Sequence, residues 1–306
     1  IRDSNIPARE IAPETVEALL AELLPPLIAE HNNGVLLDTA RMRALAARLV
    51  RRVKETAHAI VRQLAAGRFQ AEGCEVEFGR GKAYPPIEFA LSDGTRCLLS
   101  GKIDRLDGTF DEAGTRFFRV IDYKTGSAEF SYTDLYYGLK LQLPLYLAAV
   151  AAADDAAHRA LPAGFYYLPV KTPVLEEGLS GEALLKEVQK AFRLRGVSLK
   201  NAELLEAGGG PSVAPEKGTG VLGLEDFSAV AEFARRKAAQ TAEAVRTGRA
   251  ETAPYRKSKR DTACARCDYA SVCGFDPAFG GCAYRSVRTV KADAFLEEAR
   301  HETVDE

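Results

Sequence analysis

An aspartate and a lysine stand two positions apart in the segment VIDYKTG, residues 120–126. Because side chains on a strand alternate between its two faces, Asp122 and Lys124 point to the same side, while Ile121 and Tyr123 point to the other. A lone D-x-K pair is common and is typical of an exposed, salt-bridged strand. At the end of an apolar strand, however, the pair is well suited to hold a divalent cation and a water molecule next to a phosphate.

A second aspartate lies on the preceding predicted strand, which would form a hairpin with the strand of this pair. The segment GKIDR, residues 101–105, contains Asp104, and the connection to the next strand is expected to run from Leu106 to Thr115. Antiparallel pairing would bring Asp104 close to Asp122. Two converging carboxylates repel each other unless a cation lies between them, and hard oxygen ligands suit Mg²⁺ or Mn²⁺. Such a metal would polarise a scissile phosphate and lower the pKa of a bound water. Lys124 would either orient that water or stabilise the developing negative charge.

The segment GLKLQLPLY, residues 138–146, adds an amide and a hydroxyl to this candidate set. Gln142 and Tyr146 are four positions apart, so they lie on one face of a helix. On an otherwise leucine-rich helix these polar groups need partners once they are buried. We expect the active site or the backbone of a nucleic acid to supply those partners.

Hydrophobic periodicity predicts the elements that must position these residues. Helices are expected over residues 13–30, 38–66, 139–153, 181–194, 225–247 and 291–300. Strands are expected over residues 74–78, 87–91, 96–105, 116–124 and 164–170. The Gly- and Pro-rich stretch 207–220 predicts a mobile loop, and Arg256–Arg260 predicts a solvated basic linker.

The composition is that of an ordinary globular chain, with 306 residues, 46% apolar and 27% charged. The net charge of -2 does not exclude a nucleic-acid partner, because such an enzyme needs only a local basic groove. No long apolar run is present, so no membrane span is expected. The polar opening IRDSNIPARE does not read as a signal peptide, and the initial Ile predicts a piece of a longer polypeptide.

The ordered segments GKIDR, VIDYKTG and LQLPLY resemble the PD-(D/E)XK nuclease superfamily in its RecB-like branch. Within that branch they are most similar to the C-terminal nuclease domains of the AddB-type family of helicase–nuclease subunits, over about residues 37–285. The resemblance implies that Asp104 and Asp122 bind the metal and that Lys124 is catalytic. It also implies an α/β fold with a restriction-endonuclease-like core, in which helices flank a mixed central sheet, and a cysteine-clasped C-terminal lobe.

Two further family motifs bear on the metal site. The resemblance assigns Gln142 and Tyr146 to a Q-x-x-x-Y motif, and it matches Glu75 of EVEFG to an additional acidic metal ligand. Glu77 lies two residues further along the same strand face, so it stays an alternative to Glu75. The family also carries a G-x-x-x-H motif whose histidine is a metal ligand. That motif is absent upstream of Glu75, and we expect the chain to begin after it.

Cysteines gather near the C-terminus, where Cys264, Cys267 and Cys273 have C-x₂-C-x₅-C spacing and Cys282 follows. A cluster in a chain without an export signal favours a metal or iron–sulfur site in the cytoplasm over disulfides. Thiolates at this spacing suit either Zn²⁺ or an iron–sulfur cluster, and spacing alone leaves both open. The remaining pair, Cys74 and Cys97, falls on strand patterns and is expected to pack in the core.

The resemblance favours the iron–sulfur alternative. It implies that Cys264, Cys267 and Cys273 hold a [4Fe–4S] cluster together with a fourth cysteine far upstream. No such cysteine lies ahead of the nuclease core here, so we expect it to precede Ile1 in the intact protein. The cluster would then be absent or incomplete in this chain, with Cys282 as the one local substitute.

The resemblance also implies a function and a partner. The chain would cut a single strand of DNA, the one ending 5′ at a double-strand break, as an AddA-type helicase–nuclease subunit takes part in unwinding for recombinational repair. The expected layout is a leading helical segment, a nuclease core and an iron–sulfur lobe, at residues 1–70, 71–260 and 261–306.

Two alternatives compete with this function. A Cas4-type RecB-like exonuclease is generally shorter, and the long helix predicted before Glu75 favours the AddB type. A zinc-held, non-catalytic DNA-binding scaffold would be expected to have lost Asp104, Asp122 or Lys124, and all three are present.

Overall fold

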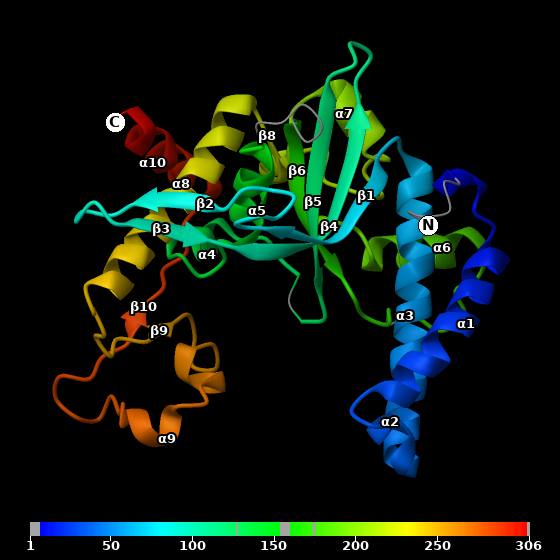
Figure 1. The fold of residues 1–306 in the computed structure, drawn as a ribbon. Helices are drawn as coiled ribbons and strands as arrows, with labels where there is room; N and C mark the ends of the chain where they lie inside the picture. The colour runs from blue at the N-terminus through cyan, green and yellow to red at the C-terminus, as the bar shows by residue number, and fades with distance from the viewer. Residues whose placement is uncertain (1–6, 127, 154–159, 174–175, 305–306) are drawn as a thin grey trace.

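A computed structural model of the chain describes residues 7–126, 128–153, 160–173 and 176–304. Its centre is a six-stranded sheet (Figure 1) with the strands, in spatial order, β1 (Gln70–Phe78), β4 (Gly101–Phe110), β5 (Arg116–Lys124), β6 (Leu161–Pro169), β7 (Arg195–Leu199) and β8 (Val221–Leu222). The β5–β6 and β7–β8 pairs are parallel and the others antiparallel. The sheet is therefore mixed, as predicted.

Helices cover both faces of this sheet. The described α-helices are α1 (Pro13–Glu30), α2 (Val35–Asp38), α3 (Ala40–Ala66), α4 (Tyr132–Tyr136), α5 (Gln142–Ala151), α6 (Gly181–Ala191), α7 (Ala202–Ala207), α8 (Leu224–Arg246), α9 (Ala270–Cys273) and α10 (Ala292–Val304). In Figure 1, α1, α3 and α6 lie on one side, and α5, α8 and α10 on the other. Within the described residues, no helix has both the length and the apolar character needed to cross a membrane.

Two small sheets complete the fold. The hairpin of β2 (Ile87–Ala90) and β3 (Arg96–Leu99) extends beside α5 and α8 (Figure 1). The short parallel pair of β9 (Tyr255–Arg256) and β10 (Arg285–Ser286) lies away from the central sheet and brackets the cysteine segment. Residues that follow this segment return to the main body, where α10 buries Phe295 and Ala299.

Side chains of β5 alternate between two hydrophobic cores, one on each face of the sheet. Val120 is fully buried in the larger core, which includes residues of α5, α8 and α10. Ile121 is fully buried in a second core with Ala59 of α3 and Phe192. Each strand residue thus faces the opposite side from its neighbour, so Asp122 is directed to the α5 side of the sheet.

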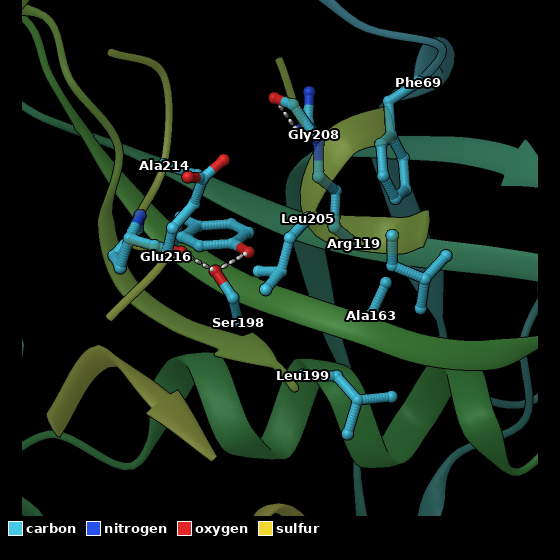
Figure 2. A pocket seen from close by; sticks show the side chains of 12 residues that line it. Phe69, Arg119, Ala163, Ser198, Leu199, Leu205, Gly208, Ala214 and Glu216 are labelled. Atoms are coloured by element: carbon cyan, nitrogen blue, oxygen red, sulfur yellow. Dashed lines mark hydrogen bonds between the residues drawn. The ribbon is translucent and has the colours of Figure 1, made fainter. Parts of the chain in front are cut away.

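The α3 side of the sheet buries a network of charges. Asp107 of β4 lies between two arginines, with Arg105 Nε 2.9 Å from Oδ1 and Arg119 Nε 2.9 Å from Oδ2. All three side chains are at most 2% exposed. Figure 2 shows Arg119 beside Gly208 and Phe69, in a cavity of about 10 Å³. That volume admits about one water, which excludes a larger ligand.

Several predicted boundaries were wrong. The strand expected over residues 96–105 is two strands in different sheets, divided at Ser100, and β4 continues to Phe110 where a connection was expected. The loop predicted over 207–220 is packed in place, because Val213 and Ala214 are buried against α3 and β6 neighbours.

The predicted core position of Cys74 was also wrong. Cys74 is exposed, although Phe78 further along the same edge strand is buried. Cys97 is half-buried and packs against the larger core, as expected. Helix α5 begins at Gln142 instead of residue 139, and neither α4 nor β7 was predicted from the hydrophobic pattern.

The buried charges lead to a prediction about stability. We expect Asp107→Ala to lower the free energy of unfolding by about 3–5 kcal/mol, because it leaves two guanidinium groups buried without a counter-charge. Urea denaturation measures this change. The control is Glu182→Ala, which removes an exposed partner of Lys186 on α6 and should have no measurable effect. Equal stability of the two variants would contradict the prediction.

Candidate active site

The β4–β5 hairpin brings two aspartates to one place on the sheet. Arg105 pairs with Ile121 in the antiparallel register, so Asp104 and Asp122 occupy the next opposed positions. The backbone N–H of Tyr123 donates a hydrogen bond of 2.8 Å to Asp104 Oδ2. This bond fixes the Asp104 carboxylate against the end of β5.

The carboxylate of Asp122 is buried away from water and has few charged or polar neighbours. Only 2% of its side chain is exposed. Burial raises the pKa of Asp122, the adjacent Lys124 opposes that shift, and the negative charge of Asp104 adds to it. Lys124 Nζ lies 2.6 Å from Asp122 Oδ2, and no other described residue donates to that oxygen. A cation is the group that would satisfy such an oxygen.

A chain of polar contacts continues from Lys124 into α5. Gln142 Oε1 accepts a hydrogen bond of 3.0 Å from Lys124 Nζ, and Gln142 Nε2 donates one of 2.8 Å to the Tyr146 hydroxyl. Burial raises the pKa of Tyr146, which therefore stays a neutral hydroxyl. The ring of Phe78 packs edge-on at 5.8 Å and holds Tyr146 in place. The amide and hydroxyl thus find polar partners in the candidate site, as predicted.

The turn into α5 explains how Gln142 reaches this position. Gly138 has φ of 72°, which lets the chain reverse after α4 at low cost. Pro144 lies in the first turn of α5, where its missing N–H leaves no hydrogen bond unmade. Gln142 is consequently the first residue of the helix, with its side chain directed to Lys124.

The two candidate glutamates on β1 differ in their surroundings. Glu75 has φ of 53°, so the strand is distorted there, and its carboxylate lies 2.7 Å from Lys102. Burial and the charges of Asp122, Asp104 and Glu75 all raise the pKa of Tyr146. Glu77 is paired with Lys82. Across the described part of the chain, no three acidic, histidine or cysteine side chains lie close enough to hold a metal ion together.

Sequence reasoning missed Tyr167 and Lys140 as neighbours of this site. Tyr167 of β6 pairs with Asp122 in the parallel register. Its ring centroid lies 5.4 Å from Lys124 Nζ and 5.9 Å from Lys140 Nζ. The strand itself was predicted, but its pairing partner depends on the path of the crossover, which periodicity does not reveal.

The site motifs lie within a region that matches a known family. A profile of the PD-(D/E)XK nuclease superfamily matches residues 3–274. The chain belongs to the PD-(D/E)XK nuclease superfamily. The core fold and the nuclease class predicted from the motifs are confirmed at this level.

Several relatives of this PD-(D/E)XK chain share one name, that of the B subunit of an ATP-dependent helicase/deoxyribonuclease. The chain is 30% identical to the protein of that name from Clostridium tetani, in an alignment 320 positions long that covers 99% of this chain and 28% of the relative. It is 29% identical to the one from Alkaliphilus metalliredigens, with 98% and 28% covered. The one from Caldanaerobacter subterraneus is 34% identical, with 83% and 23% covered. The chain therefore spans about a quarter of each relative's length, and the predicted AddB-type similarity is confirmed.

The cysteine segment has an unusual degree of exposure. No residue from 235 to 294 is buried, and all of these residues are described. Large apolar side chains stand exposed there, including Tyr269 at 72% and Val272 at 81%. The thiols of Cys264, Cys267 and Cys273 are free and do not converge on one point. A segment without a core of its own needs a crosslink or a metal to fix its shape.

The geometry of the acidic residues predicts their effect on metal binding. We expect Asp104→Ala to weaken Mn²⁺ binding by about tenfold or more, since even residues behind the ligands of a metal site usually have effects of that size. Isothermal titration calorimetry measures the affinity. Glu77→Ala is the matched control on β1 and should leave binding unchanged, whereas Glu75→Ala should weaken it. Unchanged Mn²⁺ binding by Asp104→Ala would count against the site.

Proposed function

We propose that this chain is the Mg²⁺-dependent DNA nuclease domain of a helicase–nuclease that resects double-strand breaks for recombinational repair. It hydrolyses phosphodiester bonds of one unwound strand. The observation that carries the proposal is the buried Asp122 carboxylate beside Asp104, with Lys124 as its one close cation among the described residues, in a chain of the PD-(D/E)XK superfamily.

In this proposal Asp104 and Asp122 hold the divalent cation, Mg²⁺ or Mn²⁺, with Glu75 as the additional acid once its carboxylate leaves Lys102. A bound divalent cation supplies Lewis-acid activation of the phosphate and lowers the pKa of water. Tyr123 orients Asp104 through its backbone N–H. Hard carboxylate oxygens with a buried acceptor still to be satisfied fit such an ion.

Lys124 is proposed as the residue that acts on the phosphate. Its ammonium group lies beside Asp122 and is held by Gln142, which is in turn held by Tyr146. Fixed donors of this kind stabilise developing negative charge without having to reorganise during the reaction. Gln142 and Tyr146 therefore keep the Lys124 ammonium directed at the site where the phosphate binds.

The proposed substrate and partner follow from the relatives. Their name joins a helicase to a deoxyribonuclease, which supports a single strand of unwound DNA as substrate and an AddA-type helicase–nuclease as partner. We place the reaction in the cytoplasm. The similarity is spread over nearly the whole chain, including the long helices before β1, and this favours the AddB type over a Cas4-type exonuclease.

We also propose that Cys264, Cys267 and Cys273 bind a [4Fe–4S] cluster in the intact protein. The support is their spacing together with the absence of any buried residue in the described segment that contains them. These three thiolates leave one position of such a cluster to be filled, and Cys282 is the local substitute. Cluster binding would supply the stability that packing does not provide there.

The nuclease proposal predicts that Asp122→Ala and Lys124→Ala each abolish Mg²⁺-dependent cleavage of single-stranded DNA while the protein stays folded. The reason is that one variant removes a metal ligand and the other removes the charge that faces the phosphate. Two substrates of unrelated sequence should be cut equally, since phosphate contacts carry no sequence information. Lys186→Ala on α6 is the control and should retain full activity. Full cleavage by folded Asp122→Ala protein would refute the assignment.

The cluster proposal predicts the metal content of the cysteine variants. Anaerobically purified protein that includes upstream sequence should contain iron and sulfide, and Cys264→Ser should lose both, because one of the thiolate ligands is removed. Cys74→Ser is the control and should keep them. The present chain should bind iron poorly. A full cluster in this chain that survives Cys282→Ser would show that the upstream ligand is not needed, and zinc in place of iron would favour a structural zinc site.

A further inference from the structure

A second buried carboxylate lies close to the active site, on α4. Lys257 Nζ approaches Asp134 Oδ1 to 2.6 Å, and Lys140 Nζ lies 3.4 Å from Oδ2. The Asp134 side chain is 7% exposed. Lys257 comes from a segment more than a hundred residues away in the chain, so this ion pair attaches that segment to the main body of the nuclease.

The attached segment is a closed loop of basic residues, 255–261, which we call the basic loop. The N–H of Lys257 donates to the carbonyl of Asp261 at 2.9 Å, and Arg256 forms an isolated bridge with Thr262. Arg256, Lys259 and Arg260 are exposed, and no carboxylate among the described residues pairs with any of them. The loop thus presents three unneutralised cations on a fixed backbone.

Cations continue from the basic loop to the catalytic lysine. Lys257 and Lys140 share Asp134, and Lys140 and Lys124 both lie against the ring of Tyr167. Lys140 is also held by the carbonyl oxygen of Glu129 at 2.9 Å. An unbroken series of contacts therefore joins the basic loop to the residues proposed to act on the phosphate.

Aromatic side chains accompany these cations. Tyr137, which follows α4, is 39% exposed, and its hydroxyl accepts a hydrogen bond of 3.3 Å from the N–H of Arg288. The Arg256 guanidinium lies 4.9 Å from the ring centroid of Tyr284. Of these rings Tyr137 is exposed and Tyr284 is half-buried. Cations beside accessible aromatic rings suit single-stranded nucleic acids, which bind through phosphates and stacked bases.

We propose that the basic loop binds the backbone of single-stranded DNA and leads the strand past Lys140 to the active site. The inference rests on the proposed nuclease function and adds the path of its substrate. Asp134 is a positioning residue, since it touches no DNA and holds Lys140 and Lys257 in place. A chain with net charge of -2 attracts a polyanion only where cations are concentrated, and the basic loop is such a place.

The test measures DNA binding without catalysis. The triple variant Arg256→Gln, Lys259→Gln and Arg260→Gln is compared with a control triple, Arg41→Gln, Arg48→Gln and Arg51→Gln. The control removes the same charge from exposed positions of α3, across the sheet from the basic loop (Figure 1). Binding of fluorescein-labelled oligothymidine is followed by anisotropy in EDTA, at several salt concentrations, after thermal melts establish that both variants are folded.

We expect the basic-loop triple to bind about tenfold more weakly at moderate salt and to lower the slope of log affinity against log salt by about 2, since each lost phosphate contact removes about 0.7. The control triple should match the unsubstituted chain. Equal losses in both triples, an unchanged slope, or no binding by the unsubstituted chain would overturn the inference. Binding by the unsubstituted chain without cleavage in Mg²⁺ or Mn²⁺ would instead refute the nuclease proposal and leave only DNA binding by the basic loop standing.

Discussion

A carboxylate that is removed from water at the end of a strand must be stabilised by positive charge, and Asp122 imposes that requirement on its surroundings. Its only close cation in the described structure is Lys124, two residues along the same strand face. Lys124 is itself shared with Gln142, so it does not fully compensate Asp122. Helix α5, which supplies Gln142 and Tyr146, and the nearby Asp104 complete the surroundings of this carboxylate and its lysine.

Buried charges on the α3 face of the sheet favour one register of β4 against β5, the register that places Asp104 opposite Asp122. A slip of one residue between β4 and β5 would turn Asp104 to the wrong side, and it would also separate Asp107 from Arg119 in the dry interior. Buried ion pairs contribute little net stability compared with apolar packing, but an unpaired buried charge is costly. The charges on the α3 side therefore disfavour every register in which the two aspartates of the active site do not meet.

Local features of the site could be predicted because they depend on short stretches of sequence. The bounds of β5 match the prediction at both ends, and the alternation along it placed Asp122 and Lys124 together. Contacts between distant segments could not be predicted. Lys257 reaches Asp134, and Tyr167 lies beside Asp122, only because of how the crossovers run. The exposure of Cys74 likewise depends on which elements pack over each part of β1, which is a property of the assembled fold.

The hairpin that carries both aspartates also has a consequence for the order of folding. Its Tyr123–Asp104 bond spans 19 residues, whereas β6 can join β5 only after a crossover that includes α5. Hairpins of this kind close in about 1–10 μs, and local contacts have a small entropy cost of closure. During synthesis the two negative charges can thus be brought together before β6 or α5 has packed beside them. For that interval both carboxylates are still exposed to water, and dissolved divalent cations that bind them would favour the hairpin before the rest of the sheet has formed.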